Sequence, residues 1–257
     1  MRKWLRFSWR AVALGIWLIL GLCILGLVLP FLSLARRLRI HAWWSSWLLC
    51  WCGVQVDYHG QIEQHRPVLF VLNHVSWLDI FILNKKRATS FIAKSDIRNW
   101  PLVGWLVTGA GTVYIERGQR HVIKQVATQM KARFEQSQAV GLFPEGTTSE
   151  GFTVQPFHAS LFEAALSTEV DIQPVALRFF DGDQRSSRVA FVGEQSLVAN
   201  IWLLLSQPGV RIECVFLEPL KHADNVEQGR VATAKQAHAV LLAQVEKGLN
   251  EPSVFST

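Results

Sequence analysis

One stretch decides the fold: Pro67-Val68-Leu69-Phe70-Val71-Leu72-Asn73-His74-Val75-Ser76-Trp77-Leu78-Asp79. Its first six residues form a short apolar run of the kind that makes a buried strand. The residues from Trp77 to Leu83 show the pattern of a helix start. His74 is therefore predicted to lie in the turn between the strand and the helix, and we interpret this turn as an active site.

Helical geometry limits how His74 and Asp79 can meet. The two residues are five positions apart, roughly 500° of rotation on one continuous helix, so they would not share a face. They come together only if His74 lies in the turn and Asp79 in the first turn of the helix. The Asp79 carboxylate would then accept a hydrogen bond from one ring nitrogen of His74 and leave the other as a general base.

Two other interpretations of this stretch stay open. Ser76 and Asp79 also fit a capping box, with Ser76 as N-cap and Asp79 at the third helical position, where Asp79 would only cap the helix. Ser76 also lies two residues from His74, where a hydrolase nucleophile is conceivable, but no GxSxG elbow surrounds it.

The composition indicates one sizeable core with an attachment at the N-terminus. The chain has 257 residues and is 50% hydrophobic, which excludes a disordered protein. Seven of its 26 Lys and Arg residues lie within residues 1–40, where there is no Asp or Glu, and the rest has 19 basic and 20 acidic residues. The positive charge thus belongs to the N-terminus, which favours membrane lipids as partners over nucleic acid.

The N-terminal region has the features of a membrane anchor. From Ala11 to Ala35 there is no charge, and a helix of that length would span roughly 37 Å. Pro30 interrupts this run, and Lys and Arg flank both ends in similar number, so the positive-inside rule does not orient it. Tryptophans recur near helical spacing in the next apolar stretch, at Trp43, Trp44, Trp47 and Trp51. Because indoles favour the headgroup level, we predict two membrane-anchoring helices over residues 1–53, lying in one leaflet, with a single-pass arrangement as the alternative.

A cleaved signal peptide is disfavoured, because the apolar run is long and no convincing small-residue cleavage site follows it. The four cysteines form no pair of CxxC motifs, and most fall in the predicted anchor: Cys23, Cys50, Cys52 and Cys214. We therefore expect a reduced catalytic domain that faces the cytoplasm from the inner (cell) membrane.

The rest of the chain, residues 54–257, is predicted to form one domain. Expected strands are Val54–Tyr58, Val68–Leu72, Ser90–Ala93, Gly111–Ile115, Ala139–Phe143, Ile172–Leu177, Arg188–Val192 and Arg211–Phe216. Expected helices are Leu78–Asn84, Leu102–Thr108, Arg120–Gln136, Leu161–Ser167, Val198–Leu205 and Val226–Leu249. This alternation favours an α/β sheet covered by helices.

Three later stretches place polar groups at turns. The first is Thr112-Val113-Tyr114-Ile115-Glu116-Arg117-Gly118, in which the guanidinium of Arg117 would match phosphate oxygens, although an ordinary surface arginine would look the same. The second is Val140-Gly141-Leu142-Phe143-Pro144-Glu145-Gly146-Thr147-Thr148-Ser149, which suits a polar headgroup or a plain turn. The third is Ile172-Gln173-Pro174-Val175-Ala176-Leu177, either an edge strand or a wall of the site because of its internal proline.

Together, in this order, the four stretches resemble the PlsC-like glycerolipid acyltransferases, which include 1-acyl-sn-glycerol-3-phosphate acyltransferases. His74 to Asp79 carries the HxxxxD motif, and Phe143-Pro144-Glu145-Gly146-Thr147 resembles the third block of the family. Tyr114-Ile115-Glu116-Arg117 resembles the second block, and Ile172-Gln173-Pro174-Val175 the fourth. The resemblance runs from about residue 54 to 220 and implies a glycerolipid-acyltransferase-type mixed sheet flanked by helices.

The resemblance implies transfer of a fatty acyl group from acyl-CoA or acyl-carrier protein to the hydroxyl of a lysolipid. The foremost acceptor would be 1-acylglycerol-3-phosphate, giving phosphatidic acid in membrane phospholipid biosynthesis. His74 would deprotonate the hydroxyl and Asp79 would orient His74, with no metal, other cofactor or covalent acyl-enzyme. The acceptor would be held by Arg117, Glu145, Gly146 and Thr147, and by Lys94, which falls where family members often have a basic residue.

Two departures from the family pattern leave the acceptor open. Thr148 stands where members that acylate lysophosphatidate often have Arg, and Pro156-Phe157-His158-Ala159 replaces a common Phe-Lys-x-Gly. A lyso-ornithine lipid or another lysophospholipid is therefore an alternative acceptor. A silent membrane-binding scaffold is disfavoured, because it would have no need of the set His74, Asp79, Arg117 and Glu145.

Overall fold

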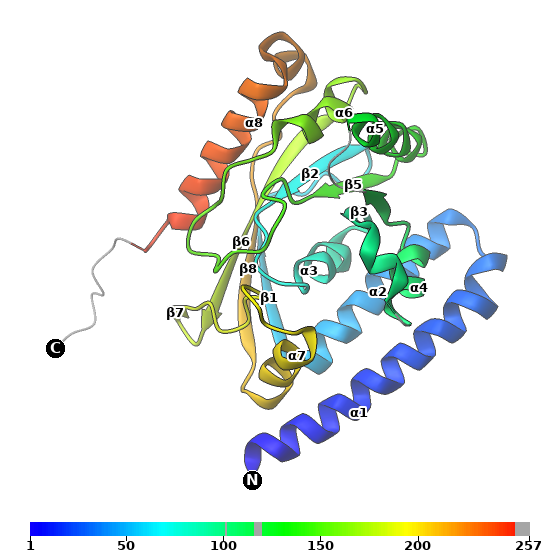
Figure 1. Ribbon diagram of the computed structural model, residues 1–257, viewed down its shortest axis with the longest axis vertical. Helices are drawn as coiled ribbons and strands as arrows, with labels where there is room; N and C mark the ends of the chain where they lie inside the picture. Colours follow the sequence, from blue (N-terminus) through cyan, green and yellow to red (C-terminus); the bar gives the residue numbers. More distant parts are fainter. Residues whose placement is uncertain (101, 116–119, 250–257) are drawn as a thin grey trace.

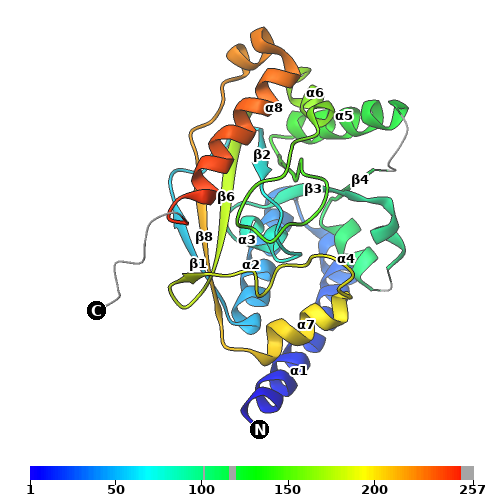
Figure 2. The ribbon, with the colours of Figure 1, turned by 60° about the vertical axis from the view of Figure 1, so that its left-hand side comes forward.

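The computed structural model describes residues 1–100, 102–115 and 120–249, which form one eight-stranded sheet with helices on both faces (Figure 1 and Figure 2). The strands are β1 Val54–His59, β2 Val68–Leu72, β3 Thr89–Lys94, β4 Val113–Ile115, β5 Ala139–Leu142, β6 Asp171–Asp181, β7 Gln184–Arg185 and β8 Val210–Phe216. The α-helices are α1 Arg2–Cys23, α2 Leu34–Cys52, α3 Asp79–Lys86, α4 Val103–Gly109, α5 Arg120–Glu135, α6 Glu163–Leu166, α7 Leu197–Ser206 and α8 His222–Glu246. Four short segments of the described residues form other kinds of helix: the π-helix η1 Ile24–Val28 and the 3₁₀-helices η2 Leu29–Phe31, η3 Ser95–Asn99 and η4 Ala159–Phe162.

The sheet is mixed, as predicted. Its strand order is β1-β8-β6-β2-β5-β3-β4, with β7 paired to β6. The strands β6, β2, β5, β3 and β4 pair in parallel, whereas β8 runs antiparallel to β6. All five parallel strands therefore end at the same edge of the sheet, and the segments that follow them meet there.

The strand β2 lies at the centre of the sheet and contributes to both hydrophobic cores. Val68, Phe70 and Leu72 belong to the core formed with α1, α2, α3 and α7. Leu69 and Val71 belong to the core formed with α5, α6 and α8. Because side chains alternate across a strand, a strand covered on both faces must be apolar throughout. This explains the continuous apolar run that precedes Asn73.

The strand β6 is central, lying between β8 and β2, which excludes the edge-strand alternative for Ile172–Leu177. Its Pro174 lies just beyond the paired part of β8, where Leu217 N–H still donates to the Pro174 carbonyl. The Leu217 carbonyl, which would face the missing N–H of the proline, accepts a hydrogen bond from Gln173 Nε2 at 3.0 Å. A neighbouring side chain thus replaces the donor that proline lacks.

The predicted strand over residues 188–192 is also wrong. The chain turns back after β6 to form the short strand β7, and the following segment leaves the sheet. Val189 and Ala190 are buried, which produced a strand-like pattern. Phe191 N–H donates to the Val75 carbonyl at 2.9 Å, so this segment packs beside the HxxxxD turn rather than in the sheet.

The N-terminal region forms two helices with a break after Pro30, but only one is a candidate span. Among the described residues, Arg2–Phe31 is long and apolar enough to cross a membrane. The second helix, α2, buries Leu48, Leu49 and Cys52 in the same core as β2 and α3. The division into residues 1–53 and 54–257 stays a prediction, and α2 packs in the same hydrophobic core as the sheet.

Two basic residues assigned to lipid by their charge bind the protein instead. Arg10 is buried, and its Nη1 donates to the carbonyls of Leu205 and Gln207 at 3.4 and 3.0 Å. Arg6 Nη1 donates to the Ser206 carbonyl at 3.2 Å. These carbonyls end α7, and cations are favourable at a helix C-terminus. The arginines therefore fasten α1 to α7.

The predicted tryptophan stripe divides between two environments. Trp43 and Trp47 are exposed and contact each other edge to face, with ring centroids 5.6 Å apart. Trp44 points inward and packs on Trp17 of α1 at 4.5 Å. A Cβ on Gly21 would lie 1.9 Å from the Trp44 ring, so α1 and α2 approach this closely only because Gly21 has no side chain.

Candidate active site

The shared edge of the parallel strands brings the sequence motifs together. His74 follows β2, and the FPEG segment that begins with Phe143 follows β5. Because β2 and β5 are hydrogen-bonded neighbours, His74 and Glu145 meet although 71 positions separate them. The strand β3 ends at Lys94 on the same edge, and β4 ends at Ile115.

The His74 ring lies against the Asp79 carboxylate. His74 Nδ1 and Asp79 Oδ2 are 2.8 Å apart. The Asp79 side chain is fully buried, whereas 21% of the His74 side chain is exposed. An ionised carboxylate only accepts hydrogen bonds, so Nδ1 carries the proton and Nε2 keeps a lone pair. The pair has the geometry of an oriented general base; its catalytic role remains a prediction.

Asp79 contacts both the imidazole and the backbone of the turn. Its Oδ2 also accepts hydrogen bonds from the backbone N–H groups of Val75 at 2.7 Å and Ser76 at 3.0 Å. The bond from Ser76 N–H corresponds to half of the predicted capping box, but α3 begins at Asp79 with Leu78 as its N-cap and no side-chain cap hydrogen bond, so the placement of Asp79 at the third helical position is wrong. One oxygen thus holds the turn, the helix start and the imidazole.

Ser76 is not placed as a nucleophile. It is fully buried, and its Oγ accepts a 3.4 Å hydrogen bond from Leu78 N–H. A hydrolase nucleophile must reach its substrate from an accessible position. The geometry therefore disfavours the hydrolase alternative.

The loop after β5 holds the backbone of His74 from both sides. His74 N–H donates to Glu145 Oε1 at 2.7 Å. Ser149 N–H donates to the His74 carbonyl at 2.8 Å. A residue whose N–H and C=O are both hydrogen-bonded has little freedom to rotate. The loop therefore fixes the backbone position of His74, from which the imidazole projects.

Phe143 positions the ring itself. The His74 and Phe143 rings are stacked with centroids 4.0 Å apart, and Phe143 stacks in turn on Phe91 at 5.2 Å. A Cβ on Gly141 would lie 2.4 Å from the Phe91 ring. Glycine at this position therefore permits the three-ring stack, which limits rotation of the imidazole.

The Glu145 carboxylate faces the protein backbone. Besides the bond from His74, its Oε2 accepts a hydrogen bond from Gln155 N–H at 2.9 Å, and the residue is buried. Burial raises the pKa of Glu145 to about 7, against the lowering effect of these two backbone bonds. In this arrangement the carboxylate ties two loops together; its predicted contact with the acceptor headgroup is untested.

The other predicted binding residues differ in what the structure says of them. Gly146 has a positive φ of 71°, which a side chain would strain, and it closes the turn in which its N–H donates to the Phe143 carbonyl. Thr147 is exposed beside it. Lys94 ends β3, but its side chain lies outside the described part of the structure, and Arg117 lies outside the described residues.

Sequence reasoning missed two buried asparagines that support the site. Asn73 exchanges two hydrogen bonds with the backbone of Leu177, at 3.0 and 2.8 Å, and so continues the pairing of β2 with β6 beyond the strand end. Asn200 of α7 accepts a 2.9 Å bond from Trp77 Nε1. Asn73 was visible next to the motif, whereas nothing local in the sequence marks Asn200.

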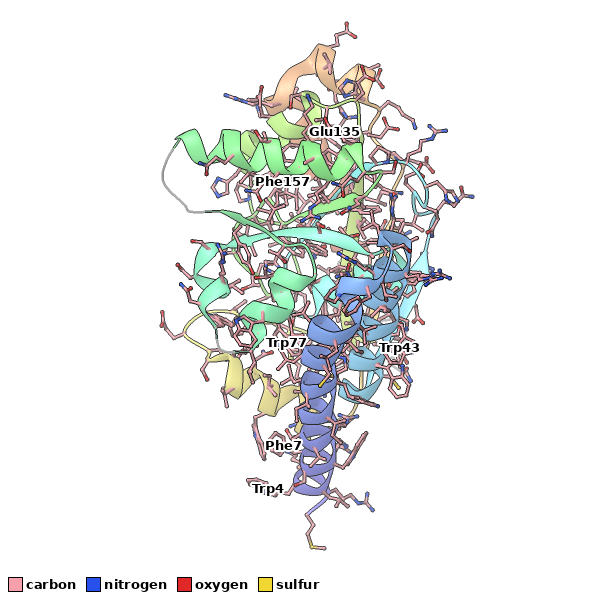
Figure 3. All side chains as sticks on the ribbon, turned by 90° about the vertical axis from the view of Figure 1, so that its right-hand side faces the viewer. Trp4, Phe7, Trp43, Trp77, Glu135 and Phe157 are labelled. Atoms are coloured by element: carbon pink, nitrogen blue, oxygen red, sulfur yellow. The ribbon has the colours of Figure 1, made fainter. Side chains whose placement is uncertain are left out.

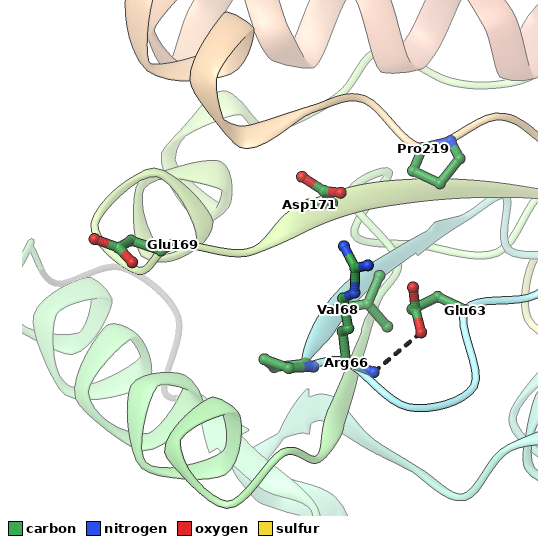
Figure 4. Close-up of a pocket in the computed structure, with 7 residues that line it drawn as sticks. Glu63, Arg66, Val68, Glu169, Asp171 and Pro219 are labelled. Atoms are coloured by element: carbon green, nitrogen blue, oxygen red, sulfur yellow. Dashed lines mark hydrogen bonds between the residues drawn. The ribbon is translucent and has the colours of Figure 1, made fainter.

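A cavity of about 190 Å³ lies away from this site (Figure 4). Its walls include Val68 and Asp171, the first residues of β2 and β6, together with Glu63, Arg66 and Glu169. It therefore opens at the opposite edge of the sheet from His74. Within the described ranges, no group of three or more His, Cys, Asp or Glu side chains is arranged for a metal ion.

The Acyltransferase family profile matches residues 54–178. A lyso-ornithine lipid O-acyltransferase of Pseudomonas aeruginosa is 33% identical over 230 residues, covering 83% of this chain and 87% of the relative. A 1-acyl-sn-glycerol-3-phosphate acyltransferase of Neisseria gonorrhoeae is 34% identical over 155 residues, covering 60% of this chain and 61% of the relative. The crystal structure of PlsC, the 1-acyl-sn-glycerophosphate acyltransferase of Thermotoga maritima, superimposes with a TM-score of 0.73 at 20% identity, covering 98% and 100% of the two chains.

The mixed sheet and these relatives define the class of the protein as an acyltransferase. The chain belongs to the PlsC-type glycerolipid acyltransferase family, as the four motifs indicated.

Replacing each member of the dyad should separate its roles. We expect His74→Ala to lower kcat by roughly 10²- to 10⁴-fold, the range for a positioned acid–base group. Asp79→Asn keeps an oxygen for the three donors but places a buried NH2 where Oδ1 lies, at a cost of about 1–3 kcal/mol. The melting temperature should therefore fall by several degrees, while activity falls by roughly two orders of magnitude or more. A folded Asp79→Asn enzyme with near-normal kcat would exclude Asp79 as the orienter.

The raised pKa of Glu145 predicts a pH-dependent stability. Folding favours its protonated form, so the contribution is complete below the ordinary pKa of 4.5 and is lost as the pH rises through about 7. The wild type should therefore lose melting temperature relative to Glu145→Gln between pH 5 and pH 8, measured in one detergent. Melting curves that run parallel over this range would show that the carboxyl is ionised throughout.

Proposed function

We propose that the protein transfers a fatty acyl group from acyl-CoA or acyl-carrier protein to the free hydroxyl of 1-acylglycerol-3-phosphate. The observation that carries the proposal is the contact between His74 and Asp79. Asp79 holds Nδ1 of the partly exposed His74 ring, so that Nε2 would be the nitrogen that receives a proton. The relatives named for this reaction and for acylation of other lysolipids support it.

The reaction needs little beyond a positioned base. His74 Nε2 takes the hydroxyl proton while the acceptor oxygen attacks the thioester carbonyl, and the buried Asp79 carboxylate stabilises the imidazolium. The tetrahedral intermediate collapses with loss of the thiolate: a C–O bond has formed and a C–S bond has broken. The imidazolium returns its proton to the thiolate, so the enzyme is unchanged and no acyl-enzyme forms.

A lyso-ornithine lipid is a second candidate acceptor, favoured by the Pseudomonas relative that matches most of this chain. The local structure is compatible with it. Thr148, which stands in place of the frequent Arg, donates its hydroxyl to the Phe191 carbonyl, and His158 is exposed. Neither supplies a fixed cation for a phosphate monoester.

One acceptor panel tests both candidates. Purified enzyme receives acyl-CoA or acyl-carrier protein with lysophosphatidate, lyso-ornithine lipid or lysophosphatidylethanolamine, and products are identified by mass spectrometry, with His74→Ala as the control. We expect phosphatidic acid as the fastest product. Exclusive acylation of the lyso-ornithine lipid would replace the first acceptor with the second, and labelling by a fluorophosphonate would contradict the whole mechanism.

The membrane attachment is proposed to be monotopic. One side of α1 buries Arg10, Trp17 and Gly21 against the rest of the protein, whereas the other side is an exposed apolar stripe. The stripe includes Trp9, Val12, Ile16, Ile19 and Leu20. A helix fastened to the catalytic domain along its length is suited to lie in one leaflet with its free face in lipid.

Cysteine accessibility tests this arrangement. In a background with Cys23 and Cys50 replaced by Ser, single cysteines are placed at the exposed positions Arg2 and Gln64. In sealed vesicles, both should react with an impermeant maleimide from the same side, the cytoplasmic one. Labelling from opposite sides would establish a membrane-spanning α1 instead.

A further inference from the structure

We infer that α4, together with Trp100 and Leu102, is a second membrane-inserted element, in addition to α1. The inference rests on the proposed attachment through α1 and extends it to a segment that follows β3, far from the N-terminus in sequence. The partner is the lipid surface itself.

Three large apolar side chains of this segment are exposed. Trp100, Leu102 and Trp105 are 39%, 49% and 68% exposed. The helix α4 has the sequence Val-Gly-Trp-Leu-Val-Thr-Gly, which contains no charged residue. Exposed tryptophans next to leucines are costly in water but favourable at a membrane interface, where an indole meets both headgroups and acyl chains.

The segment is continuous with the lipid-facing helix. A Cβ on Gly109 of α4 would lie 2.2 Å from Leu25 of η1, the segment that continues α1. A Cβ on Gly21 of α1 would lie 3.0 Å from Leu106 of α4. Two glycines, one in each partner, therefore let α4 lie directly beside α1. Figure 1 and Figure 2 show the two elements adjacent, and in Figure 3 both lie on the side that faces the viewer.

The segment that contains α4 begins at the same edge of the sheet as the candidate active site. The chain leaves β3 at the edge of the sheet where the HxxxxD turn lies, passes through η3 and α4, and returns as β4. Inserting α4 would therefore place this edge of the sheet at the bilayer surface. A lysolipid would then reach His74 from the lipid phase with its acyl chain still among other chains.

Depth measurements test the insertion directly. An environment-sensitive fluorophore is attached to single cysteines at Trp105, at Ile16 of α1 and at Val231 of α8, in the background lacking Cys23 and Cys50. Val231 is an exposed apolar residue of α8, a helix that lies away from α4 in Figure 1 and Figure 2. With vesicles of phosphatidylethanolamine and phosphatidylglycerol carrying doxyl-labelled chains, we expect quenching at positions 105 and 16 and none at 231.

The outcomes separate this inference from the attachment on which it rests. Quenching at position 16 without quenching at 105 would overturn the insertion of α4 and leave the α1 anchor intact. Absence of quenching at both positions would overturn the anchor and the inference together. Equal quenching at 231 would show unspecific adsorption and would also overturn the inference.

Activity provides a second readout. We expect Trp105→Asp to lower kcat/KM for vesicle-borne lysolipid by about tenfold, because a carboxylate replaces a large apolar ring in the interface. Activity on a short-chain acceptor dissolved below its critical micelle concentration should not change, and Trp105→Phe should restore the vesicle reaction. Val231→Asp is the matched control. An equal loss on dissolved and vesicle-borne acceptors would show that Trp105 acts on the site and not on the membrane.

Discussion

The site depends on a single buried oxygen. Asp79 Oδ2 accepts hydrogen bonds from the His74 ring and from the backbone N–H groups of Val75 and Ser76, while Oδ1 is buried with no hydrogen-bond partner among the described residues. A carboxylate removed from water is costly, and three donors on one oxygen offset that cost only when the turn, the helix start and the imidazole are all in place. The same interactions that stabilise the buried carboxylate thus also fix the position of the His74 ring.

The remaining restraints on the imidazole come from the neighbouring strand. Because β2 and β5 are adjacent and parallel, the loop after β5 reaches the backbone of His74 through Glu145 and Ser149, and Phe143 stacks on the ring. His74 is therefore held at its backbone, at Nδ1 and on one face. In the proposed reaction, Nε2 and the exposed side would be left for the substrate, and this preorganisation would avoid reorientation of the base during proton transfer.

Much of this was predictable from the sequence, and the failures have physical causes. The apolar run before Asn73 and the spacing of His74 and Asp79 predicted the strand, the turn and the contact, because these depend on local periodicity and geometry. The orientation of the Glu145 carboxylate and the support from Asn200 depend on which segments meet after folding, and no local pattern encodes them. The interpretation of Arg10 was wrong for the same reason. Its charge suggested contact with lipid, whereas its hydrogen-bond partners are carbonyls at the end of α7, 195 and 197 positions away in the sequence.

The same long-range contacts connect α1 to the candidate active site. Trp4 and Phe7 of α1 pack on Trp202 of α7 with ring centroids 4.5 and 4.3 Å apart. Two positions before Trp202 on the same helix, the Asn200 side chain accepts a hydrogen bond from Trp77 in the HxxxxD turn. Asn200 also donates to the Ala190 carbonyl at 3.1 Å, which fixes the loop beside that turn. Contacts made by α7 therefore link α1 to the residues beside His74. In the proposed one-leaflet arrangement, α1 would define the plane of the bilayer, and these contacts would set the orientation of His74 relative to that plane. The proposed reaction would depend on such a link, because an acceptor anchored by its acyl chain can present its hydroxyl only from a narrow range of depths.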